Sequence, residues 1–326
     1  MAHIGIIGVG SYVPPHEMSN DDWAEIVDTS DEWITTKTGM KKRRIADSDV
    51  CTSDLAVEAC KVALENSGLK VSDIDLIILA TSSPDVPMSS TAGIVQDKLG
   101  CTDCVAFDIN AVCAGWVHAL DIGSRFAGTE GYENVLVVGS EVYSRILNWG
   151  DRSTCVLFGD GAGAVVLSRV PEGKGIIGSW MMSDGSGSSV IEIPAGGTRV
   201  PIPSEGFKEG MQYFHMDGRA VWDFAIEAFP QAVLSVLERC GKTIDEVDLI
   251  IPHQANINII EKGMEKLGLP MGKTFTNLHK YGNTAGASVP ISIVEAFEEN
   301  SIREVVLVVT VAFGGGLAWG ANLIQF

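Results

Sequence analysis

An internal duplication is the feature that most constrains how this chain folds. Two segments with the same order of strand, helix and strand patterns follow one another along the 326 residues. The runs 73–79 and 246–252 match, as do 134–139 and 304–309, and each half closes with a glycine-rich strand, at 159–167 and 313–324. The strands are nearly continuous runs of Val, Ile and Leu, which is typical of parallel strands covered by helices on both faces. The sequence predicts an α/β fold of two similar halves that share a helical layer.

The division between the halves is placed near residue 172, which gives segments 1–172 and 173–326. The first half carries an insertion at about 20–49, which begins with a helix that Asn20 can cap. The second half begins with a segment at about 173–214 that is rich in Gly, Pro and Ser and has little helical pattern. We expect this segment to line the approach to the seam between the halves, since such crevices are common ligand sites.

Composition argues against several classes of function. The formal net charge of −19 argues against nucleic-acid binding, which needs a positive surface. No apolar run reaches the roughly 18 residues that span a bilayer, and no signal segment opens the chain, so we expect a cytoplasmic protein. The seven cysteines are scattered and do not resemble a disulfide framework. Cys101 and Cys104 have CxxC spacing but lack partners at ligand spacing, so we interpret them as structural residues and expect no metal site.

Cys113 is the candidate nucleophile. It follows the strand-like run 105–109 and precedes an apolar helical pattern, so its thiol should lie at a helix N-terminus. The helix dipole and the unpaired N–H groups there favour a thiolate, and such cysteines titrate below their usual value of about 8.5. The structural alternative is a small core residue in a tight junction between strand and helix.

Two further motifs favour catalysis. HQAN at 253–256 directly follows a strand-like run, and YGNTAGAS at 281–288 precedes an apolar helix. Taken alone, His253 fits a structural imidazole and Asn283 fits a helix cap. Together with Cys113 they supply a nucleophile, an imidazole and an amide on three loops, the set expected for nucleophilic catalysis on an acyl group. We expect the three side chains to meet at the seam.

These motifs, the sequences GDGAGAVVL and FGGGLAWG and the duplication together resemble the β-ketoacyl-acyl carrier protein synthase III family of the thiolase superfamily. The resemblance covers essentially the whole chain. It implies a thiolase-like fold, with two duplicated βαβαβαββ-type halves in a five-layered αβαβα sandwich. It also implies a homodimer.

The resemblance implies an acyltransferase that initiates fatty acid synthesis by a decarboxylating Claisen condensation. Cys113 would take an acyl group from acyl-CoA as a thioester. His253 and Asn283 would then hold the carbonyl of malonyl-acyl carrier protein while carbon dioxide leaves, and preorganised donors of this kind are worth several kcal/mol. The backbone N–H groups of Cys113 and Gly315 would form the oxyanion hole. No cofactor is expected, because the thioesters and the loss of carbon dioxide drive the reaction.

Binding residues are also implied by the resemblance. The CoA and pantetheine channel would be lined by Thr29, Trp33, Lys37, Arg152, Gly218, Trp222 and Asn256, and the acyl pocket by Met88, Trp116, Phe158 and Phe313. Met88 would reach into the neighbouring subunit. Lys37 stands where the family often has an arginine, and lysine lacks the bidentate fork that grips phosphate. Asn258 stands where the family often has an arginine that docks the carrier protein, so we expect Lys262 and Lys266 to take over docking.

Two other functions stay open at this stage. A related acyltransferase of secondary metabolism would use the same cysteine for a different acceptor. A non-catalytic scaffold would keep the fold without the chemistry, although it would have no use for the complete set of Cys113, His253, Asn283 and Gly315. An enzyme like hydroxymethylglutaryl-CoA synthase is less compatible with the sequence, because Asn283 cannot act as the glutamate base of that reaction.

Overall fold

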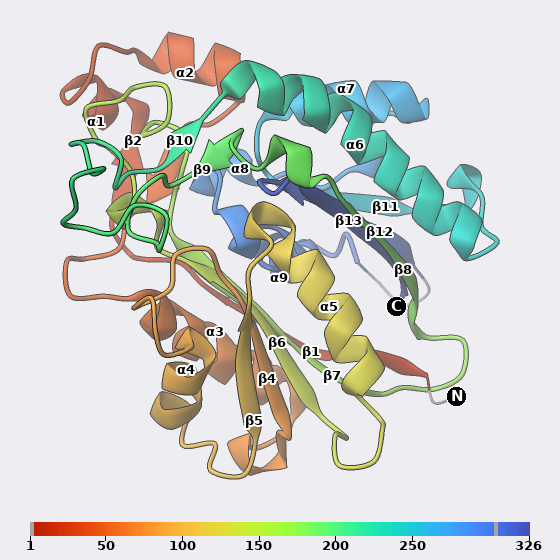
Figure 1. Ribbon diagram of the computed structural model, residues 1–326. Helices are drawn as coiled ribbons and strands as arrows, with labels where there is room; N and C mark the ends of the chain where they lie inside the picture. The colour runs from red at the N-terminus through yellow and green to blue at the C-terminus, as the bar shows by residue number, and fades with distance from the viewer. Residues whose placement is uncertain (1–2, 303–305) are drawn as a thin grey trace.

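The computed structural model describes residues 3–302 and 306–326, and it has five layers in the order helix, sheet, helix, sheet, helix (Figure 1). The first sheet has the strand order β1 (Ile4–Tyr12), β7 (Gly161–Arg169), β6 (Val135–Glu141), β4 (Leu76–Ala80) and β5 (Val105–Ile109). The second has the order β11 (Leu249–Pro252), β12 (Leu307–Gly314), β13 (Ala318–Gln325) and β8 (Gly175–Ser183). The start of the predicted run 304–309, Glu304 and Val305, lies outside the described residues.

The duplication extends to strand direction. In the first sheet β1 and β7 are antiparallel, β7 and β6 are antiparallel, and β6, β4 and β5 are parallel. The second sheet repeats this order from β8 through β13 and β12 to β11, and Thr274 forms a parallel bridge to Ile250 where a fifth strand would stand. The near-continuous apolar runs of the core strands follow from their burial on both faces. The predicted thiolase-like five-layered fold is therefore confirmed.

Helices cover both faces of each sheet. The outer helices on the first sheet are α3 (Thr52–Ser67) and α4 (Thr91–Leu99), and those on the second are α6 (Gly218–Arg239) and α7 (Ile257–Leu267). Between the sheets lie α5 (Gly115–Phe126) and α9 (Ser288–Glu298). Nine of the eleven residues of α9 are buried, because this helix has a sheet on either side. The shared helical layer predicted from the duplication is thus formed by α5 and α9.

Smaller elements lie around the rim of the sandwich. The insertion near the N-terminus forms β2 (Glu17–Ser19), α1 (Asn20–Ala24), α2 (Asp31–Thr38) and β3 (Lys42–Arg44). The prediction that Asn20 caps the first helix is wrong. Ser19 is the cap and accepts from the Asp22 N–H, whereas Asn20 is buried and its amide donates to the Met40 carbonyl and accepts from Arg43. The insertion is anchored by buried polar contacts, which a local capping pattern does not reveal.

Three other expectations need correction. The segment 173–214 does not line the seam along its whole length, because its first part forms β8, the edge strand of the second sheet, whereas Ile191 and Phe214 from its later part do line the cavity there. Its remainder contains β9 (Ile191–Glu192), which pairs with β10 (His215–Met216). The glycine-rich run 313–324 is two strands, the end of β12 and most of β13, joined by a turn. Cys101 and Cys104 form a disulfide, because the short turn between α4 and β5 brings their sulfur atoms together.

Helix α6 is the one helix among the described residues that is long and apolar enough to cross a membrane. Its buried side chains, such as Phe229 and Val233, pack on β8, β12 and β13. This pattern is also that of a core helix, and one such helix is weak evidence for a membrane span.

Candidate active site

A cavity of about 470 Å³ lies at the seam between the two halves. Cys113 comes from the first half, whereas His253 and Asn283 come from the second, and all three line this cavity. The other predicted residues that line it are Trp33, Lys37, Gly218, Trp222, Asn256, Phe158 and Phe313. Three loops that are far apart in sequence therefore meet at one place, as the sequence predicts.

Cys113 lies on a 3-10 turn, Val112–Ala114, that leads directly into α5. Val112 has a φ of 48°, a left-handed conformation that is strained for a β-branched residue. The second half repeats the arrangement, because Ala285 has a φ of 44° at the start of the 3-10 turn Ala285–Ala287 before α9. Strain next to the nucleophile is thus part of the duplicated junction, and the predicted position of Cys113 at a helix start is confirmed.

The electrostatics of Cys113 differ from the sequence expectation. The residue is only 7% exposed, and burial raises the pKa of its thiol. The Glu141 carboxylate raises this pKa further, and a backbone hydrogen bond acts in the opposite direction. The expectation of a lowered pKa is therefore wrong here, because loss of water around the sulfur outweighs the stabilisation of a thiolate by nearby donors.

His253 follows β11 and is held on both sides. Its backbone N–H donates to the Val311 carbonyl at 2.7 Å, and its Nδ1 lies 2.6 Å from the Ser288 hydroxyl at the start of α9. Burial lowers the pKa of the imidazole to about 3, so the ring is neutral at pH 7. Because Nδ1 is engaged by Ser288, Nε2 is the ring nitrogen left for a substrate.

Asn283 is fixed through backbone and side chain. Its N–H donates to the Leu157 carbonyl and its carbonyl accepts from the Gly159 N–H, both segments of the first half. Its side-chain oxygen accepts from the Ala285 N–H at 2.8 Å, so the NH₂ group is the part of the amide left to donate elsewhere. The preceding Gly282 has a φ of +65°, and a Cβ there would lie 2.9 Å from the Leu157 oxygen. This close approach explains the glycine of the YGNT motif.

Gly314, at the end of β12, packs directly against the nucleophile. A Cβ on Gly314 would lie 2.8 Å from the Cβ of Cys113 and 3.3 Å from its Sγ. Gly315 does not line the cavity among the described residues, and it packs on Ile191 and Val112. The N–H of Gly315 is part of the peptide group between Gly314 and Gly315, and Gly314 does contact Cys113. A role of this N–H in an oxyanion hole stays a prediction.

The residues predicted to hold CoA gather near α2. The guanidinium of Arg152 lies 5.5 Å from the centre of the Trp33 ring and also donates to the Asp28 carbonyl. A base that stacks on this face of Trp33 must displace Arg152 or move it outward. Thr29 is not among the lining residues, and its buried hydroxyl has no hydrogen-bond partner within the described chain. Its role as a ligand stays a prediction.

Two of the four predicted acyl-pocket residues do not line the cavity. Phe158 and Phe313 do, and Phe158 packs against Tyr143 and Phe214 in an aromatic cluster. Trp116 lies fully buried in the core between the sheets, because α5 directs it away from the cavity. Met88 is 90% exposed on the loop between β4 and α4, so it lies outside the cavity of its own chain.

The residues expected to dock a carrier protein already have partners. Lys262 forms an ion pair with Glu265 at 2.7 Å, and Lys266 forms one with Glu227 on α6. The amide of Asn258 is also engaged, because it donates to the Lys37 carbonyl at 2.8 Å, as does that of Asn256 at 2.9 Å. The positive charge of this face is therefore offset by neighbouring glutamates, and docking by these lysines stays a prediction.

Sequence reasoning missed several polar residues behind the cavity. Glu141, at the end of β6, is fully buried and accepts hydrogen bonds from Thr81, Ser82, Ser83 and Gly286. Burial raises its pKa to about 7, although these donors lower it. Ser288, Gln254 and Glu295 were missed as well. An acid directly after an apolar strand, as in VLVVGSE, was the available signal for Glu141.

Comparison with known proteins places this chain in a family. Models of 3-oxoacyl-[acyl-carrier-protein] synthase III match residues 107–185, and models of its C-terminal part match residues 237–326. The chain is 49% identical over 322 residues to a β-ketoacyl-[acyl-carrier-protein] synthase III of Caldanaerobacter subterraneus subsp. tengcongensis, covering 99% of this chain and 97% of that one. Among solved structures, the synthase III of Aquifex aeolicus is 42% identical with a TM-score of 0.91, covering 99% of this chain and 100% of that one. That of Thermus thermophilus is 39% identical with a TM-score of 0.93, covering 99% of each chain. The chain therefore belongs to the 3-oxoacyl-[acyl-carrier-protein] synthase III family.

Proposed function

We propose that this enzyme condenses an acyl-CoA primer with malonyl-acyl carrier protein and so initiates fatty acid synthesis. The observation that carries the proposal is the meeting of Cys113, His253 and Asn283 in one cavity at the seam. Family membership supports the same reaction. The loss of carbon dioxide and the thioesters supply the driving force, so the proposed route needs no metal or cofactor.

In the first half-reaction Cys113 is the nucleophile. Its Sγ bonds to the thioester carbon, the bond from that carbon to the sulfur of CoA breaks, and CoA takes up the proton that the thiol loses. The backbone N–H groups of Cys113 and Gly315 are the proposed donors to the transient oxyanion. CoA would reach the cavity past Trp33, Lys37, Gly218, Trp222 and Asn256, with Thr29 and Arg152 at the outer end.

In the second half-reaction His253 and Asn283 donate hydrogen bonds to the malonyl thioester oxygen. The bond to the carboxylate carbon breaks, carbon dioxide leaves, and the electron pair forms an enolate. The enolate carbon attacks the acyl-cysteine carbonyl and releases the Cys113 sulfur, which takes up one proton from solvent to restore the thiol. The NH₂ group of Asn283 supports this role. The Ser288 hydroxyl also accepts weakly from the Gln254 N–H at 3.4 Å, which leaves its hydrogen for Nδ1 of His253 and favours a proton on Nε2.

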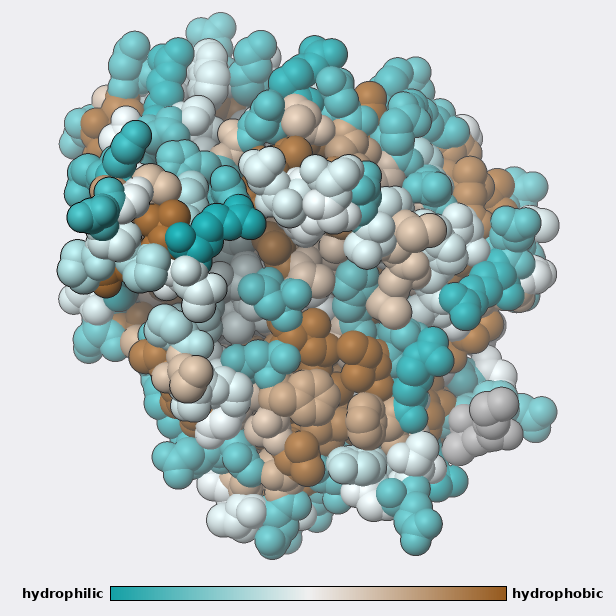
Figure 2. Space-filling model, viewed as in Figure 1, coloured by the Kyte–Doolittle hydropathy of each residue, from teal (hydrophilic) through white to brown (hydrophobic). Residues whose placement is uncertain are grey.

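A homodimer is part of the proposal. Strand β5 is the outer strand of the first sheet, and all five of its residues are partly exposed, although it carries Val105, Phe107 and Ile109. Figure 2 shows an apolar area on this side of the molecule, over α5 and the neighbouring edge of the first sheet. An open apolar edge strand favours pairing with a second chain. Such pairing would place the exposed Met88 against the partner, as its proposed role in the partner's acyl pocket requires.

A cytoplasmic location is also part of the proposal, because the enzyme's proposed substrates, acyl-CoA and malonyl-acyl carrier protein, favour it.

The test uses acetyl-, butyryl-, isobutyryl- and octanoyl-CoA as primers with malonyl-acyl carrier protein. We expect an acyl adduct on the Cys113 peptide by mass spectrometry, and carbon dioxide release that requires His253 and Asn283. Acylation without decarboxylation would favour an acyltransferase of secondary metabolism. Absence of any adduct would favour the scaffold. Light scattering checks the dimer, and a monomer at micromolar concentration would contradict it.

A further inference from the structure

Helix α9 carries three polar side chains on one face of its buried part, 288–296, whose other residues are apolar. Ser288, Ser292 and Glu295 are spaced by four and three residues, which places them one above another on a helix. Ser288 contacts His253, and Ser292 donates to the side-chain oxygen of Asn277 at 3.0 Å. Burial of a polar side chain costs free energy of folding unless the group is hydrogen-bonded. The polar stripe on α9 is therefore stable only because its groups have these partners.

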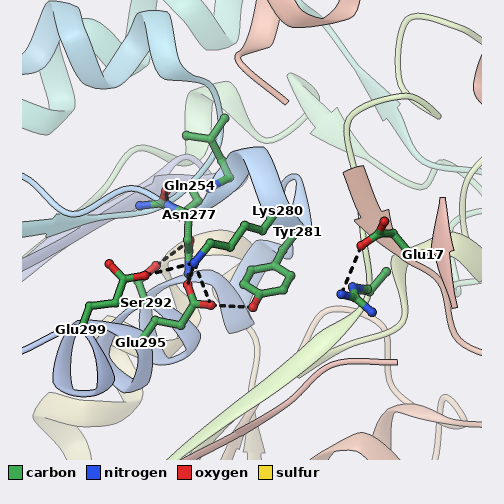
Figure 3. A network of polar contacts seen from close by, with 10 residues as sticks. Glu17, Gln254, Asn277, Lys280, Tyr281, Ser292, Glu295 and Glu299 are labelled. Carbon is green, nitrogen blue, oxygen red and sulfur yellow. Dashed lines mark hydrogen bonds and ion pairs between the residues drawn. The ribbon is translucent and has the colours of Figure 1, made fainter. Parts of the chain in front are cut away.

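Glu295 is the centre of the network at the lower end of the stripe. Its carboxylate accepts from the Asn277 amide at 2.9 Å and from the Tyr281 hydroxyl at 2.5 Å, and Lys280 lies 3.4 Å away (Figure 3). All three partners lie on or next to the short helix α8 (Leu278–Tyr281). Glu295 is only 8% exposed, so these interactions are little screened by water. The carboxylate therefore holds α8 against α9.

Helix α8 joins the loops that carry the two proposed donors. Gln254, the residue after His253, accepts from the backbone N–H groups of Asn277 and Leu278 and donates to the Phe275 carbonyl. At the other end of α8, Gly282 and then Asn283 follow Tyr281 directly. The position of α8 thus sets the spacing between the His253 loop and the Asn283 loop.

We propose that Glu295 is a positioning residue for the decarboxylation half-reaction, acting through α8 on His253 and Asn283 without touching substrate. This inference rests on the proposed function and assigns a role to a residue outside the cavity. Cys113 is carried by a different junction, at the start of α5, whereas α8 connects directly to the Asn283 loop and, through Gln254, to the His253 loop. We therefore expect the acylation of Cys113 to depend much less on α8 than decarboxylation does. Only the second half-reaction requires the spacing that Glu295 holds.

The test is Glu295→Gln, with Glu299→Gln as the matched control. The Glu295 carboxylate has two acceptor oxygens, which accept from Asn277, Tyr281 and Lys280. Glutamine has one acceptor oxygen, so at least one of these donors would face its NH₂ group instead. Glu299 directly follows α9, four residues after Glu295, and also pairs with Lys280, at 3.1 Å. Within the described residues, the hydrogen bonds of Asn277 and Tyr281 on this side go to Glu295 and not to Glu299. The two variants therefore remove the same charge beside the same lysine.

We expect Glu295→Gln to lower carbon dioxide release from malonyl-acyl carrier protein by about 10- to 100-fold, while Cys113 acetylation from acetyl-CoA keeps the wild-type rate. Glu299→Gln should leave both rates unchanged. Tyr281→Phe removes a single hydrogen-bond donor to Glu295 and should give a smaller loss in decarboxylation. It is the variant that tests the proposal if Glu295→Gln does not fold. Equal loss in both half-reactions, or wild-type decarboxylation in Glu295→Gln and Tyr281→Phe, would overturn the inference. A wild-type enzyme that does not decarboxylate the malonyl thioester would instead refute the proposed function.

Discussion

Gly314→Ala tests the geometry around the nucleophile most directly. The added methyl group would lie 2.8 Å from the Cβ of Cys113, 3.1 Å from its backbone nitrogen and 3.3 Å from its Sγ. Carbon atoms in contact are normally about 3.5–4.0 Å apart, so the two backbones must separate by roughly 1 Å. A displacement of this size at a reacting group can cost about 100-fold in rate, and overpacking costs about 1–3 kcal/mol in stability.

The assay follows acetylation of Cys113 by acetyl-CoA with time, together with urea unfolding of the same variant. Gly272→Ala is the control, because a Cβ there has open space around it. We expect Gly314→Ala to acetylate about 100-fold more slowly, whereas Gly272→Ala matches the wild type. Acetylation of Gly314→Ala at the wild-type rate would refute the conclusion that Gly314, at the end of β12, packs directly against Cys113.

Three further predictions concern charge. Because burial raises the pKa of the Cys113 thiol, its alkylation by iodoacetamide should become faster with every step up to pH 9, and a plateau reached below pH 7 would contradict this. Glu141 has a pKa of about 7 in the folded protein, against 4.5 for an ordinary glutamate. Between these pH values the folded state binds one more proton than the unfolded state, so the free energy of unfolding falls as the pH rises from 4.5 to 7. In urea unfolding from pH 4.5 to 7, the free energy of unfolding of the wild type should fall by up to about 3 kcal/mol more than that of Glu141→Gln. The same pH dependence in both proteins would show that the pKa of Glu141 is not raised. Lys262→Glu combined with Lys266→Glu should raise the KM for malonyl-acyl carrier protein several-fold if these lysines dock the acidic partner, and an unchanged KM excludes them.

Local sequence patterns determined most of the secondary structure that positions the site. Strand β5 has the bounds that its apolar pattern predicts, because a short apolar run followed by a polar residue leaves few alternatives. The three candidate catalytic residues could also be recognised from the sequence. Cys113, His253 and Asn283 each lie at a junction where a strand or loop meets a helix.

Only the tertiary structure decided how those residues behave. The pKa of Cys113 depends on water excluded by both halves, and the direction of Trp116 depends on which sheet α5 covers. Lys266 is paired with Glu227, 39 residues away, and Glu295 acts on residues from another helix. Charge, burial and hydrogen bonding depend on neighbours brought together through space, whereas periodicity and capping depend on neighbours along the chain. The sequence alone therefore determined the elements and the reacting groups, and the packing of the two halves decided their environment.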